Sequence, residues 1–164
     1  MDSNVLLHLV LSGVGLELCI ESQQDRLNIQ KAVYLVQACG LHLGYPYSWY
    51  KMGPYSPELT KDYYAAKEKT FCPTAGWQLN PVAAGLVERA KSLMTPPRDV
   101  DSTDWREALA SVHFAFSNFE ASAAEGKLAE KAHLDSVVPL AKQALVRMSL
   151  LKPNICPELA TTGT

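Results

Sequence analysis

The segment GPYSPE at positions 53–58 constrains the fold of this chain more than any other feature. Glycine followed by proline interrupts regular secondary structure, so positions 53 and 54 predict a sharp turn. Ser56, followed by Pro57 and Glu58, supplies an N-cap, a proline at the first helical position and an acid in the first turn. We therefore expect a turn and then a helix over residues 57–69.

The residues before this segment show the spacing of a helix that begins at Arg26. Asp25 can act as its N-cap, and apolar residues recur every three or four positions after it: Leu27, Ile29, Val33, Tyr34 and Val36. The polar residues between them are expected on the solvent side: Arg26, Asn28, Gln30, Lys31 and Gln37. Gly40 can end the helix, because a residue without Cβ enters the left-handed conformation at low cost.

Between that helix and the turn, the pattern changes to a period of two. From Tyr45 to Met52, one face would carry Tyr45, Tyr47, Trp49 and Lys51, and the other Ser48, Tyr50 and Met52. This alternation predicts a short aromatic strand that ends at the glycine-proline step.

Other start and stop signals predict further helices on both sides of this central part. Asp2 or Ser3 can cap an opening helix through Leu11. Asn80 and Pro81 repeat the cap-plus-proline signal before a helix ending near Met94, with an apolar stripe of Val82, Leu86, Val87, Ala90 and Leu93. We expect loop structure over residues 71–76 and a brief extended piece over residues 77–79.

The second half of the chain is predicted to be helical. Thr103 can cap a helix whose apolar stripe is Trp105, Leu109, Val112, Phe116 and Phe119, and two more helical stretches are expected over residues 126–134 and 136–151. The domain organisation we expect is a core over residues 1–94, a Pro-rich linker over 95–103, a helical part over 104–152 packed on the core, and a flexible tail over 153–164. The fold class is mainly α: a winged-helix-like helical core with a short β-strand or hairpin, and a C-terminal helical hairpin or bundle.

Composition sets wider limits. The 164 residues are 48% apolar and 20% charged, which is typical of a globular protein with a real core. The formal net charge of −2 and the pI near 6.1 give no global attraction for nucleic acid. The apolar run near the start is shorter than the roughly 20 residues of a membrane helix and follows no basic leader, so we expect a cytoplasmic protein without membrane contact.

No residue pattern indicates catalysis, a metal or a cofactor. The four histidines, His8, His42, His113 and His133, stand apart in the sequence and none pairs with a carboxylate at a metal-ligand spacing. The four cysteines, Cys19, Cys39, Cys72 and Cys156, are scattered and predict reduced, mostly buried thiols. We therefore expect a protein that is not an enzyme and needs no cofactor.

An aromatic cluster gives the first candidate site. Ring side chains gather between positions 45 and 64, and tyrosine joins a large apolar face to a polar tip, which suits a protein-protein surface. The residues predicted to contact a partner protein are Tyr47, Trp49, Tyr50, Tyr55, Tyr63 and Tyr64. The equally weighted alternative is that these rings form the half-exposed edges of a core.

Lysines beside the turn give a second candidate. Lys51, Lys61 and Lys67 could contact phosphates if the helix over 57–69 entered a DNA groove. Nearby acids offset this charge, so a solvated helix face is the favoured explanation. A winged-helix DNA-binding regulator is therefore the alternative function.

The central part of the chain also resembles a known group. RLNIQKAVYLVQ, followed by SWYKMGPYSPEL, is similar to the pattern of small bacterial proteins related to the Panacea domain and the SocA-like antitoxins. The similarity covers about residues 25–94, and its matching positions are Lys31, Tyr34, Gly53, Pro54 and Leu59. The resemblance implies a non-enzymatic protein that binds a toxin, or an accessory subunit of a phage-defence or mobile-element system. A homo-oligomer would be compatible with either role.

Overall fold

The computed structural model describes residues 2–69 and 74–156, and in them the chain is mainly helical with one small antiparallel sheet of two strands. The chain divides into two compact units, residues 1–92 and 93–164. The expected loop over 71–76 falls partly outside the described residues, as do Cys72 and most of the expected tail. No helix in the described ranges is long and apolar enough to cross a membrane.

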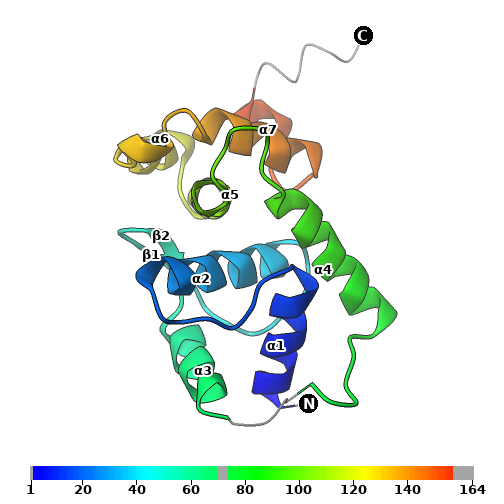
Figure 1. Ribbon diagram of the computed structural model, residues 1–164. Helices are drawn as coiled ribbons and strands as arrows, with labels where there is room; N and C mark the ends of the chain where they lie inside the picture. Colours follow the sequence, from blue (N-terminus) through cyan, green and yellow to red (C-terminus); the bar gives the residue numbers. More distant parts are fainter. Residues whose placement is uncertain (1, 70–73, 157–164) are drawn as a thin grey trace. The chain divides into compact units, whose positions relative to one another are not determined.

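The first unit is built around three helices, α1 (Ser3–Gly13), α2 (Gln23–Ala38) and α3 (Pro57–Lys67), which Figure 1 shows in blue to green. α1 contacts both α2 and α3. Their apolar faces and Ile20, from the connection between α1 and α2, form one buried cluster whose other members are Leu7, Leu11, Ile29, Val33, Leu59 and Tyr63. The prediction of an opening helix capped by Asp2 is confirmed, since the Asp2 side chain accepts a hydrogen bond from the amide of Asn4.

α2 begins three residues earlier than expected. Its N-cap is Ser22, whose hydroxyl accepts a hydrogen bond from the amide of Asp25 at 3.0 Å, while the Asp25 carboxylate accepts one from the amide of Ser22 at 2.9 Å. This is a capping box, and the hydrogen bonds from Ser22 hold the pKa of Asp25 below its usual value. The assignment of Asp25 as the cap was wrong because serine and aspartate both suit that position. The helix ends at Ala38 with Cys39 as its C-cap, and Gly40 follows with φ of 111°.

The aromatic strand is shorter than predicted and belongs to a hairpin. β1 (Ser48–Tyr50) pairs antiparallel with β2 (Gly53–Tyr55), and Lys51 and Met52 form the connection. The expectation that the glycine-proline step ends the strand structure is therefore wrong. Proline is accepted in β2 because the sheet has only two strands, so both are edge strands.

Two helix starts in the first half agree with the sequence prediction. The Ser56 hydroxyl accepts a hydrogen bond from the amide of Leu59, and α3 begins at Pro57. The Asn80 side chain accepts one from the amide of Ala83 at 2.8 Å, and α4 (Pro81–Met94) begins at Pro81. The predicted stripe of α4 is wrong at one position, since Val82 is 74% exposed.

The second unit centres on α5 (Ser102–Asn118), which contacts both α6 (Ala121–Ala129) and α7 (Val138–Arg147). Its N-cap is Asp101, whose carboxylate accepts hydrogen bonds from the amides of Thr103 and Asp104. Thr103, the expected cap, lies inside the first turn. The helix is buried over most of its length, and the indole nitrogen of Trp105 donates to the carbonyl oxygen of Leu93 at 2.9 Å.

The helix expected over 126–134 is wrong in its bounds. α6 ends at Ala129, and a short 3-10 segment, η1 (Ala132–Leu134), follows it. The last predicted helix is confirmed as α7 with a proline in its first turn, but it is shorter than expected and is followed by η2 (Pro153–Ile155). Of the described cysteines, Cys39 and Cys156 are buried and Cys19 is partly buried.

Candidate functional site

Gln30 of α2 holds the GPYS segment in place through a pair of hydrogen bonds to one backbone unit. Its side-chain oxygen accepts from the amide of Ser56 at 2.9 Å, and its side-chain nitrogen donates to the carbonyl oxygen of Ser56 at 2.9 Å. The same nitrogen donates to the hydroxyl of Thr60 at 3.0 Å. Gln30 is 2% exposed, so these bonds satisfy polar groups that water does not reach.

A second glutamine makes the same kind of contact two helical turns later. The Gln37 side chain accepts from the amide of Tyr45 and donates to its carbonyl oxygen, both at 3.0 Å. Residues seven apart lie on nearly the same side of a helix. One side of α2 therefore fastens both ends of the segment that contains the hairpin.

Lys31 completes this attachment. Its side-chain nitrogen donates a hydrogen bond to the carbonyl oxygen of Pro54 at 2.6 Å, and the residue is 1% exposed. The placement of Gln30 and Lys31 on the solvent side of the helix was therefore wrong. A periodicity argument assigns every polar residue to the surface, and it cannot anticipate that a buried backbone segment requires hydrogen-bond partners.

A groove of about 440 Å³ opens on the first unit between α2, the hairpin and α3. We call it the tyrosine groove. It is lined by Gln23, Arg26, Leu27, Gln30, Lys31, Tyr50, Lys51, Met52, Gly53, Tyr55, Thr60, Tyr63 and Tyr64. Most of its exposed surface is apolar, and its charged lining residues are all basic: Arg26, Lys31 and Lys51.

Three of the predicted partner-binding tyrosines present ring surface at this groove. Tyr50 and Tyr64 are 48% and 47% exposed. The rings of Tyr50 and Tyr55 meet edge to face with centroids 5.2 Å apart, and the Tyr55 and Thr60 hydroxyls lie 2.6 Å apart. Aromatic rings held by such contacts lose little freedom on binding, which favours their use as contact residues.

The other predicted aromatic residues lie differently. Tyr63 is 1% exposed and belongs to the core cluster, although it also forms part of the groove wall. Tyr47 packs edge to face on Tyr34 at 5.0 Å and donates to the carbonyl oxygen of Gln30, and burial raises its pKa. Trp49 is partly buried in β1 and is not a groove-lining residue.

The three lysines are not brought together at one site. Lys51 lines the groove, Lys61 is exposed on α3, and Lys67 pairs with Glu21 at 2.8 Å. The hydrogen bond to Glu21 also raises the pKa of Lys67. Since both partners of this pair are well exposed, it contributes little to stability.

Of the basic residues that line the groove, sequence reasoning nominated Lys51 but missed Arg26 and Lys31. The guanidinium of Arg26 donates to the carbonyl oxygen of Ile20 at 2.7 Å, which fixes it at the start of α2 beside the hairpin. A signal in the sequence was the i, i+4 spacing of Arg26 and Gln30, which places these two polar side chains on the same side of the helix.

Comparisons of the chain with protein-family models, curated proteins and solved structures found no match. The similarity to Panacea-domain and SocA-like proteins stays a hypothesis that rests on the residues quoted above. Three of those residues have a clear structural role. Lys31 and Pro54 form one hydrogen bond, and Leu59 belongs to the core cluster.

Proposed function

We propose that this chain is a non-enzymatic interaction protein of the bacterial cytoplasm, antitoxin-like or an accessory of a defence or mobile-element system, and that it binds a partner protein in the tyrosine groove. One observation carries the proposal. The groove combines exposed tyrosine rings with three basic side chains and has no aspartate or glutamate among its described lining residues.

The chemistry of the groove indicates what its partner would present. Leu27, Met52 and the tyrosine rings offer apolar contact, and methionine adapts its shape to the surface it meets. Arg26 and Lys51 would attract a carboxylate, because opposite charges steer association and fix its register. The expected ligand is a protein segment with an apolar or aromatic anchor next to an aspartate, a glutamate or a chain terminus.

We also propose a more specific fold for the first unit. We regard the first unit as winged-helix-like, with the β1–β2 hairpin as a small wing beside α3. The hydrogen bonds from Gln30 and Lys31 support this idea, because they attach the hairpin rigidly to the helices. A rigid hairpin keeps Tyr50 and Tyr55 in place for binding.

The test is affinity purification of the tagged chain from its native host after nuclease treatment, followed by mass spectrometry. The unaltered chain and a Trp77→Ser control should retain the same stoichiometric partner. Trp77 is 53% exposed and lies outside the groove, so it matches Tyr64 in character. Tyr64→Ser and Lys51→Glu should lose most of that partner while keeping the helical circular dichroism of the unaltered chain.

Retention of the same partner by all four proteins would contradict the proposal. Recovery of DNA without a protein partner, with salt-sensitive binding that declines when Lys61 and Lys67 are replaced, would favour the regulator instead. In that case α3 would be the helix that enters the groove of the DNA.

A further inference from the structure

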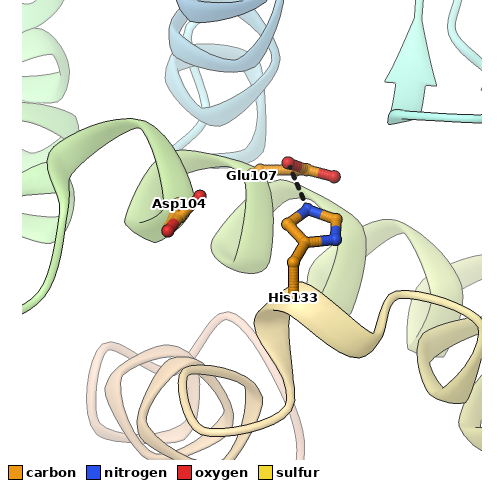
Figure 2. A group of neighbouring side chains, drawn as sticks. All are labelled: Asp104, Glu107 and His133. Atoms are coloured by element: carbon orange, nitrogen blue, oxygen red, sulfur yellow. Dashed lines mark hydrogen bonds and ion pairs between the residues drawn. The ribbon is translucent and has the colours of Figure 1, made fainter.

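In the second unit, three side chains with metal-binding atoms come together from two segments. Asp104 and Glu107 are three residues apart on α5, so they lie on the same side of the helix. His133 comes from η1 and approaches them, and Figure 2 shows its ring directed at the Glu107 carboxylate. One ligand atom from each of the three residues lies within 4.8 Å of the other two.

The distances between these side chains would allow a metal ion to replace the hydrogen bond between Glu107 and His133. The distance between Glu107 Oε2 and His133 Nε2 is 3.1 Å. Two ligands that each bind an ion at about 2.1 Å are about 3.0–3.4 Å apart for octahedral to tetrahedral angles. Asp104 would need to move by about an ångström or two, which rotation of its partly exposed side chain can supply.

The contacts of Glu107 favour binding of a metal ion through one of its carboxylate oxygens. Glu107 is 1% exposed, and its Oε1 accepts a hydrogen bond from Lys131 Nζ at 3.0 Å. Lys131 thereby occupies one carboxylate oxygen and leaves Oε2 turned toward the imidazole. Such outer contacts fix the orientation of metal ligands.

Charge and access also favour a cation. Asp104 and Glu107 bring two carboxylates close together beside the imidazole of His133, so a positive ion among them would offset neighbouring negative charge. The His133 side chain is 49% exposed, which leaves a path from solvent and room for water as a further ligand.

We propose that the second unit binds one divalent transition-metal ion of the zinc class through Asp104, Glu107 and His133, with water completing the coordination. The donor set of one imidazole and two carboxylates suits Zn²⁺, Co²⁺ or Mn²⁺ better than Cu⁺, which prefers sulfur. The ion would join η1 to α5. It was not expected from the sequence, because His133 lies 26 or more positions after the two carboxylates. The inference is independent of the function proposed for the first unit.

The test uses the full chain after treatment with a chelator and a reductant. Zn²⁺ affinity is measured by competition with a chromophoric chelator, and Co²⁺ is added in parallel to record the visible spectrum. The variants are His133→Ala, in which an exposed ring is lost, and Asp104→Asn, which keeps the shape of the side chain. His42→Ala, which removes an exposed histidine in the first unit, is the matched control.

We expect one tightly bound Zn²⁺ per chain, unchanged affinity in the control, and a loss of at least about tenfold in each ligand variant. The Co²⁺ spectrum should lack the thiolate-to-metal charge-transfer band. Absence of binding would overturn the proposal. Binding that persists in both ligand variants, or a thiolate band, would also overturn it and assign the ion to cysteines. If His133→Ala does not fold, His133→Gln takes its place.

Discussion

The buried side-chain nitrogen of Lys31 lies 2.6 Å from the carbonyl oxygen of Pro54 and donates a hydrogen bond to it. This contact joins the middle of α2 to the strand that carries the glycine-proline step. It lies beside the pair of bonds between Gln30 and the backbone of Ser56. The segment around the glycine-proline step is therefore held in part by side chains of a helix more than 20 residues earlier.

Replacement of Lys31 should destabilise the first unit. In Lys31→Met the apolar stem is kept, but the Pro54 carbonyl loses its buried donor, which costs about 1–3 kcal/mol of unfolding free energy. Urea denaturation measures this loss. Lys61→Met, on the exposed side of α3, is the control and should change stability by less than about 0.5 kcal/mol. Equal effects of the two changes would show that the Lys31 hydrogen bond is unimportant.

Gln30→Leu should have a larger effect than the equivalent change on the surface of the same helix. It leaves both the amide and the carbonyl of Ser56 without their glutamine partner in a buried place, so we expect a loss of about 2 kcal/mol or more. Gln24→Leu, at an exposed position of α2, serves as the control in the same urea titration. If both variants unfold at the same urea concentration, the glutamine does not hold the segment.

Glu107 and Lys131 form a buried ion pair, with side chains 2% and 5% exposed. Removal of one partner leaves an uncompensated buried charge, so Glu107→Leu alone should cost about 3–5 kcal/mol. The double variant Glu107→Leu with Lys131→Met should recover much of that loss. A double-mutant cycle by thermal unfolding measures the coupling, and strictly additive losses would contradict it.

His113 of α5 should make stability fall at acidic pH. Burial lowers its pKa from 6.5 to about 4. Above pH 6.5 neither state binds the proton, whereas between pH 6.5 and 4 the unfolded chain does and the folded chain does not. The folded state should lose up to about 3 kcal/mol across this window, and the loss should level off below pH 4.

The measurement is the difference in unfolding free energy between the unaltered chain and His113→Gln at several pH values. Taking this difference removes the contribution of the carboxylates, which titrate in the same pH range in both proteins. The difference should change between pH 6.5 and 4, whereas Gln24→Leu, which alters no ionisable group, should give a constant difference. A flat result for His113→Gln would mean that the ring is accessible to protons in the folded chain.

Local signals in the sequence predicted the helices well but misplaced several of their starts. Ser56 and Asn80 were predicted correctly as N-caps, because the proline that directly follows each of them marks the first helical position. Asp25 and Thr103 were chosen where Ser22 and Asp101 are the caps, since each site offers two residues able to accept the bond.

The parts that the sequence did not predict depend on contacts between distant residues. The fold class allowed for a hairpin, but its second strand was not located, because proline usually ends a strand and the tolerance of a two-stranded sheet for proline becomes visible only once its pairing is known. The burial of Gln30 and Lys31 depends on backbone groups more than 20 residues away. Tyr50, Tyr55 and Tyr64 could be nominated from their clustering, but Arg26 joins them only in the folded chain.

The most direct test of the central claim, that the tyrosine groove binds a partner protein, is photo-crosslinking in the native host. A photoreactive phenylalanine analogue replaces Tyr64 in one strain and Trp77 in another, since the two residues are similarly exposed and only Tyr64 lines the groove. The account predicts one discrete protein adduct from position 64, resistant to nuclease, and none of that mass from position 77. No adduct at 64, the same adducts at both positions, or an adduct to nucleic acid would contradict it.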